Sequence, residues 1–180
     1  MKKVLLLAGL AGMVAANAQA FDATPYVGAD ATFALVHRDS AISQFTKNHN
    51  WSLAGVLGAR TDHFGIEAFY NQGLRTVKNR GRTRNTSYGV DLLAFQQLGC
   101  SGRWELVGSA GLAEYKYRAH NEAGFGGAYT DKGLGERLGA GVQYALTEKA
   151  SIRAMYHHNW VHDSHVDGFD EFTIGLRYAF

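Results

Sequence analysis

Apolar and polar side chains alternate along much of the chain after Pro25. The last nine residues show this most clearly, because polar or small residues separate Phe172, Ile174, Leu176, Tyr178 and Phe180. Successive side chains of a strand point to opposite faces, so a period of two predicts β-strands. The pattern predicts eight strands, at about residues 26–36, 51–60, 64–74, 86–98, 103–117, 134–146, 150–161 and 171–180. The 22 glycines and single proline also favour strands joined by glycine-rich turns.

The connections between these strands alternate in length. The short ones are expected at residues 61–63, 99–102 and 147–149, and the long ones at 37–50, 75–85, 118–133 and 162–170. Short turns at one end and longer loops at the other are typical of a transmembrane β-barrel, whose turns face the periplasm. The sequence therefore predicts an all-β, eight-stranded antiparallel up-and-down transmembrane barrel.

Two features indicate that the apolar columns face outward. The polar columns are rich in glycine, as a narrow interior requires. The apolar columns also end in aromatic residues at two levels: Trp51, Tyr70 and Trp160 towards the loops, and Phe64, Trp104, Tyr144, Tyr178 and Phe180 towards the turns. Aromatic rings at both water–lipid boundaries are typical of membrane proteins. Eight strands leave an interior that side chains fill, so we expect no open channel.

The N-terminal residues predict export. Lys2 and Lys3 precede an apolar run over residues 4–16, and the small residues at 18 and 20 supply a cleavage site. We expect residues 1–20 to be a cleaved signal peptide and residues 21–180 to form a single barrel domain. Without those two lysines, 16 basic residues equal the 16 acidic ones, so no global charge favours nucleic acid. Cys100 is the single cysteine, which excludes an intrachain disulfide.

Three stretches carry a family resemblance. They are Gly65-Ile66-Glu67-Ala68-Phe69-Tyr70, the stretch over residues 138–153, and the terminal strand. Here the chain resembles the OmpA-type membrane domains and the OmpX- and Opa-like small barrels of Gram-negative outer membranes. The resemblance implies an integral outer-membrane protein whose terminal aromatic residues, Tyr178 and Phe180, are read by the barrel-assembly machinery. It implies no catalytic residues, no cofactor and no metal.

Charged residues at inward positions form one candidate site. We expect a barrel-interior polar network of Asp30, Glu67, Asp91, Gln143, Arg153 and Arg177, with Arg60 and Glu105 also inward. Charges removed from bulk water must be paired or hydrated, so the first hypothesis is a plug. The second is a gate for small solutes. The resemblance matches Glu67 and Arg153 to charged lumen positions, whereas Gln143 replaces a carboxylate and Phe95 a basic residue.

A basic segment between the third and fourth predicted strands is a second candidate. It carries Arg75, Lys78, Arg80, Arg82 and Arg84 and no acidic residue. At the level of lipopolysaccharide phosphates, arginine forks would pair with phosphate oxygens. The expected partners are therefore outer-membrane lipid and lipopolysaccharide, and the expected role is structural or surface-interacting. The alternative is an adhesin or immune-evasion factor that binds a host-surface polyanion through this segment.

The histidine-rich region near residues 157–170 raises two further alternatives. Lipid A deacylases of the PagL type are also eight-stranded barrels with a His-x-Ser motif, but His157-His158-Asn159 has Asn where the nucleophile belongs. The His and Asp residues here lack a standard metal-ligand spacing. We therefore expect neither enzymatic activity nor a metal site.

Overall fold

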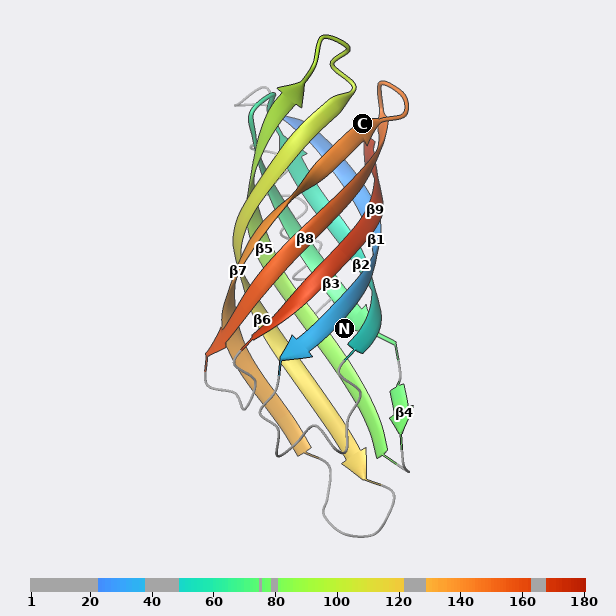
Figure 1. The fold of residues 1–180 in the computed structure, drawn as a ribbon, viewed down its shortest axis with the longest axis vertical. Coiled ribbons are helices and arrows are strands. Elements are labelled where there is room, and N and C mark those ends of the chain that lie inside the picture. The colour runs from blue at the N-terminus through green and yellow to red at the C-terminus, as the bar shows by residue number, and fades with distance from the viewer. Residues whose placement is uncertain (1–22, 38–48, 75, 79–80, 122–128, 163–167) are drawn as a thin grey trace.

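The computed structural model describes residues 23–37, 49–74, 76–78, 81–121, 129–162 and 168–180 (Figure 1). These residues form nine strands: β1 (Thr24–His37), β2 (His49–Arg60), β3 (Phe64–Gly73), β4 (Thr76–Lys78), β5 (Gly81–Leu98), β6 (Trp104–Asn121), β7 (Tyr129–Ala145), β8 (Ala150–His162) and β9 (Gly168–Ala179). In the described part of the chain there is no helix with the length and apolar character needed to cross a membrane. The predicted signal peptide lies outside the described residues.

Eight of the nine strands close into a barrel. Each pairs antiparallel with its neighbours in chain order, β3 pairs with β5, and the first strand β1 pairs with the last strand β9. The short strand β4 pairs only with the start of β5, as a hairpin at the loop end. The predicted eight-stranded antiparallel up-and-down barrel is therefore confirmed.

The register of the strand pairs determines how steeply the strands tilt. One row of paired residues runs once around the barrel and returns to β1 ten residues earlier: Leu35, Asp170, His158, Leu138, Ala110, Leu92, Ile66, Ala59 and Pro25. A stagger of this size accompanies the strong strand tilt found in small barrels. Residues far apart along a row therefore differ in height within the barrel.

The sequence predictions placed three strand ends wrongly. β5 begins at Gly81 rather than near residue 86, β6 continues to Asn121, and β7 begins at Tyr129. The expected connections over residues 75–85 and 118–133 are therefore partly paired strand. Beyond the bilayer both faces of a strand meet water, so the apolar alternation fades while the backbone hydrogen bonds continue. In Figure 1 these three strands project past the others at the end opposite the short turns.

The outward and inward faces follow the predicted parity. In β9, the side chains of Phe172, Ile174, Leu176 and Tyr178 are 49–57% exposed, whereas Arg177 is 6% exposed. The aromatic residues at both predicted levels also lie on the outer face: Trp51, Tyr70, Trp160, Phe64, Trp104, Tyr178 and Phe180 are exposed, and Tyr144 packs against Trp104. The outer surface of the membrane-spanning part is thus apolar, and the charged residues of the inward columns lie inside.

Candidate functional site

Glu67 is the centre of the interior polar network. Its Oε2 accepts hydrogen bonds from the Tyr26 hydroxyl (2.8 Å), Arg153 Nη1 (2.9 Å) and Arg177 Nε (3.1 Å). Arg177 Nη2 donates to Glu67 Oε1 at 3.2 Å and to Asp30 Oδ2 at 3.0 Å, and Nη1 donates to Asp30 Oδ1. Strands β1, β3, β8 and β9 are thereby linked across the interior.

The network continues from Arg153 towards the turn end. Arg153 Nε donates to Gln143 Oε1 at 2.8 Å, and Gln143 Nε2 donates to Glu105 Oε2 at 2.9 Å. Arg60 then holds Glu105 with both terminal nitrogens, at 2.9 and 2.8 Å. The neutral amide of Gln143 therefore serves as a relay that accepts from a guanidinium and donates to a carboxylate. The residues of this network lie in the half of the barrel nearer the short turns, which is the top in Figure 1 and the periplasmic side of such barrels. We call them the lower network: Asp30, Glu67, Glu105, Arg60, Arg153, Arg177, Gln143 and Tyr26.

The charges of the lower network balance. Three carboxylates (Asp30, Glu67 and Glu105) meet three guanidinium groups (Arg60, Arg153 and Arg177). Phe95 on β5 adds a ring to this layer: the Arg60 guanidinium lies 3.9 Å from its centroid and that of Arg153 5.5 Å. Stacking of cations on an aromatic face is favourable. The aromatic residue at this position therefore supports the cations without adding charge.

Asp91, which the sequence analysis placed in the interior polar network, is buried in the interior and pairs with Arg137 rather than with the lower network. Its Oδ1 lies 3.4 Å from Arg137 Nε, and Arg137 Nη2 lies 3.7 Å from Glu171 Oε2. Arg137 also lies over the Phe69 ring, 4.3 Å from its centroid. We call Asp91, Arg137 and Glu171, with the neighbouring His157 and Asn71, the upper cluster. It occupies the half of the interior nearer the loops.

The sequence reasoning missed Arg137, Glu171 and Tyr26 as interior polar groups. Parity could have found them, because Arg137 shares a column with Gln143, and Glu171 shares one with Arg177. Tyr26 similarly shares a column with Asp30 on β1. Extending each inward column along the whole strand, beyond the residues where the apolar alternation is clearest, would have included these side chains.

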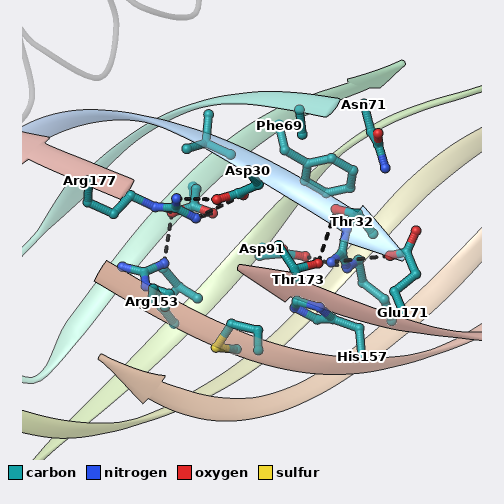
Figure 2. A pocket seen from close by; sticks show the side chains of 16 residues that line it. Asp30, Thr32, Phe69, Asn71, Asp91, Arg153, His157, Glu171, Thr173 and Arg177 are labelled. Atoms are coloured by element: carbon teal, nitrogen blue, oxygen red, sulfur yellow. Dashed lines mark hydrogen bonds and ion pairs between the residues drawn. The ribbon is translucent and has the colours of Figure 1, made fainter. Parts of the chain in front are cut away.

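Apolar side chains fill the remaining interior and leave a small cavity among the described residues. Leu93, Phe95, Val107 and Met155 form one buried cluster, and a second surrounds Phe69, Tyr115 and Phe169. A cavity of about 30 Å³ lies between the lower network and the upper cluster (Figure 2). That volume holds water-sized molecules only.

The basic segment is described only in part. Arg75 and Arg80 lie outside the described residues, whereas Lys78 lies in β4, and Arg82 and Arg84 lie in β5. The register places Arg84 opposite Arg118 of β6, and Arg82 opposite His120. The strand pairing therefore brings a second basic residue next to the predicted segment.

The histidines of β8 divide between the two faces. His157 is buried in the interior, whereas His158 lies on the outer face with its Nδ1 2.7 Å from Asp170 Oδ1, which also accepts from the Tyr156 hydroxyl at 2.7 Å. Asn159, at the position compared with a nucleophile, is fully buried and bonds Tyr115 and the Phe169 carbonyl. Among the described residues no three His, Cys, Asp or Glu side chains are arranged to hold a metal ion.

The terminal aromatics lie on the outer face at the turn end. Tyr178 and Phe180 are 49% and 65% exposed, and their ring centroids lie 6.0 Å apart. The Phe180 backbone nitrogen donates to the Pro25 carbonyl at 3.2 Å, which fixes the last residue beside the first strand.

A closed up-and-down barrel with an apolar outer face and a charged interior defines a small transmembrane β-barrel protein. The family model described as the outer membrane protein beta-barrel domain matches residues 4–180. The chain belongs to this family, and its place is the outer membrane.

Solved structures of similar fold include those of a neisserial surface protein and of Ail. Neisserial surface protein A (NspA) is 19% identical with a TM-score of 0.70, covering 88% of this chain and 99% of that chain. Ail, the attachment invasion locus protein of Yersinia pestis, is 15% identical with a TM-score of 0.60, covering 88% and 97%. A second Ail structure, in complex with the heparin analogue sucrose octasulfate, is 14% identical with a TM-score of 0.57 over the same shares. No curated protein sequence matches the chain.

Proposed function

We propose that this barrel is a non-conducting outer-membrane protein that presents a basic surface to anionic groups at the cell exterior. The observation that carries the proposal is the register of the extended strands β5, β6 and β7. Arg84 pairs with Arg118, and Lys116 pairs with Lys132. Short turns of such barrels face the periplasm, so these extensions lie on the external side.

The basic positions share one face. The even-numbered residues of β5, β6 and β7 are the outward ones within the membrane, as exposed Leu92, Leu112 and Leu138 show. Arg82, Arg84, Lys116, Arg118 and Lys132 continue these columns past the lipid-facing residues. Lys116 is partly neutralised by Glu114, whose Oε1 lies 2.7 Å from its Nζ. The other four positions form the basic face of the proposal.

Lipopolysaccharide phosphates are the first partner of this basic face. They lie around the barrel at the height where the strands leave the bilayer, and arginine pairs with phosphate in a bidentate geometry. A host-surface sulfated glycan is the second partner, favoured by the binding of a heparin analogue to Ail. The second partner would make the protein an adhesin.

Charge-neutralised variants separate these partners. The triple variant Arg82→Gln, Arg84→Gln, Arg118→Gln should lose binding to lipopolysaccharide-containing vesicles, with no loss for the matched variant Arg103→Gln near a short turn. If the triple variant elutes from a heparin column at the same salt concentration as the wild type, the adhesin role is rejected. Unchanged binding to both probes would reject the basic face altogether.

The filled interior supports the absence of a channel. The lower network spans the barrel with hydrogen bonds of 2.8–3.2 Å, and the cavity above it measures about 30 Å³. Purified protein in planar bilayers should therefore show no stable single-channel current. Regular current steps from the wild-type protein would contradict the plug and support the gate.

The protein has no catalytic role in this proposal. On the outer face, the residue two positions after His158 is Trp160 rather than a nucleophile, and Asn159 lies in the interior. Lipid A should therefore keep the same acyl chains in cells with and without this protein, as measured by mass spectrometry. A lost acyl chain that depends on His158 would establish an enzyme.

Export and assembly complete the proposal. Residues 1–20 direct secretion and are removed, and the barrel-assembly machinery recognises the terminal aromatics Tyr178 and Phe180. Their exposure on the outer face of the last strand supports this role. N-terminal sequencing of the outer-membrane form should begin near Phe21.

A further inference from the structure

The cavity between the two polar layers is lined by charged groups from several strands. Asp91, His157 and Glu171 point into it from β5, β8 and β9 (Figure 2), and Arg137 of β7 lies beside them. Asp30, Glu67, Arg153 and Arg177 form its lower wall. The β2 residues at its wall, Ala54 and Val56, carry no charge, and β6 places the hydroxyl of Ser109 beside His157. The cavity is therefore polar and buried.

The hydrogen bonding around this cavity is incomplete. Arg137 lies 3.4 Å from Asp91 and 3.7 Å from Glu171, whereas the lower network has contacts of about 3 Å. The side-chain atoms Asn71 Oδ1 and His157 Nδ1 are buried without a hydrogen-bond partner. Polar groups at such separations, next to a space that admits water, are normally joined by bridging water.

The charges lining the cavity do not balance. Four carboxylates (Asp30, Glu67, Asp91 and Glu171) face three guanidinium groups (Arg137, Arg153 and Arg177). The lower network is neutral by itself, so the excess negative charge belongs to Asp91 and Glu171, which share Arg137. An unpaired charge out of bulk water is costly, and the usual remedy is uptake of a proton.

His157 is a poor carrier for that proton. All three guanidinium groups, those of Arg137, Arg153 and Arg177, line the same cavity as its ring. A positive imidazolium would be repelled by each of them. Asp91 and Glu171, which share the one guanidinium group of Arg137, are the carboxylates left to take up the proton.

We propose that the cavity is a binding site for water that carries one proton shared between Asp91 and Glu171. The proton leaves a hydronium ion of the bulk solvent and adds to a carboxylate oxygen, so that one O–H bond breaks, another forms and a water molecule is released. The waters join this carboxyl pair to Arg137, Asn71 and His157. The site is independent of the basic face, and it makes the interior of the folded barrel neutral.

Infrared spectroscopy of the folded protein in detergent micelles tests the site directly. At pH 7 the wild type should show the C=O stretch of one protonated carboxyl, shifted on transfer to D₂O. Either Asp91→Asn or Glu171→Gln alone should abolish the band, because one remaining carboxylate balances Arg137. The matched control Glu114→Gln, which removes a carboxylate on the outer face, should keep it. Absence of the band in the wild type, or its survival in either variant, would overturn the proposal.

Stability against pH gives a second readout. A folded state that holds one extra proton loses stability as pH rises, once the unfolded carboxylates are ionised above about pH 5.5. Relative to Glu171→Gln, the unfolding equilibrium constant of the wild type should rise roughly tenfold per pH unit until the proton is released. Because the other titrating groups are common to both proteins, identical pH dependence would also reject the proton.

Discussion

Replacement of Glu67 by Gln tests whether the lower network holds the barrel together. The variant keeps the side-chain volume but removes the charge that pairs with Arg153 and Arg177, leaving this layer with one excess positive charge. Glu67 accepts four hydrogen bonds in the structure, three of them at a single oxygen. Removing one partner from a buried, hydrogen-bonded ion pair costs about 3–5 kcal/mol.

Reversible unfolding in urea, followed by tryptophan fluorescence and by heat-modifiable gel migration, measures this loss. Glu67→Gln should lower the free energy of unfolding by about 3–5 kcal/mol, whereas Glu114→Gln, in an ion pair on the outer face, should change it by at most about 1 kcal/mol. Adding Arg153→Met to Glu67→Gln restores neutrality, so the double variant should lose less than the sum of the single losses. A loss below about 1 kcal/mol for Glu67→Gln, or strict additivity in this cycle, would refute the reasoning.

Three further predictions concern packing, orientation and assembly. A Cβ at Gly175 would overlap the Asp30 carboxylate, so Gly175→Ala should lower the yield of the heat-modifiable folded form, whereas Gly55→Ala, with nothing within 4 Å, should not. Cys100 is exposed in the turn between β5 and β6, so a membrane-impermeant maleimide should label it only after the outer membrane is opened. Labelling of Cys100 in intact cells would show that the short turns face the cell exterior. Phe180 is 65% exposed, so Phe180→Ala should reduce insertion in cells but change the urea midpoint of the purified protein little. Equal amounts of the variant and the wild type in the outer membrane would reject a role of Phe180 in assembly.

Period-two alternation, together with the alternating connection lengths, the glycine-rich polar columns and the two aromatic levels, was sufficient to predict the barrel and the face of each column. Arg177 and Leu176 differ in exposure as parity requires, because the lipid face selects apolar residues along the whole span. Where the strands leave the bilayer this selection ends. The paired residues Arg84 and Arg118 were therefore assigned to loops, although their backbones continue the sheet.

The choice of partners inside the barrel could not be predicted from parity. Asp91 and Glu67 are directly paired across β5 and β3, yet Asp91 contacts Arg137, and Glu67 contacts Arg153 and Arg177. Strand tilt gives cross-strand partners different heights, and side chains that meet in the interior come from adjacent strands, as for Asp30 and Arg177, or from strands further around the barrel, as for Glu67 and Arg153. The sequence contains the inward positions but not the stagger that selects among them.

The contact between Asp30 and Arg177 has a consequence for how the protein is made. The two residues are 147 positions apart and lie on the first and last strands, so this pair forms only when the two ends of the sheet meet. Until then Glu67 and Asp30 lack a guanidinium that they share in the finished barrel. Closure of the sheet and pairing of Asp30 with Arg177 are thus one event, governed by a contact of very high sequence separation, and such contacts form slowly. An open, partly built barrel would leave the Asp30 carboxylate without its guanidinium partner, which disfavours release into the lipid before the last strand has docked.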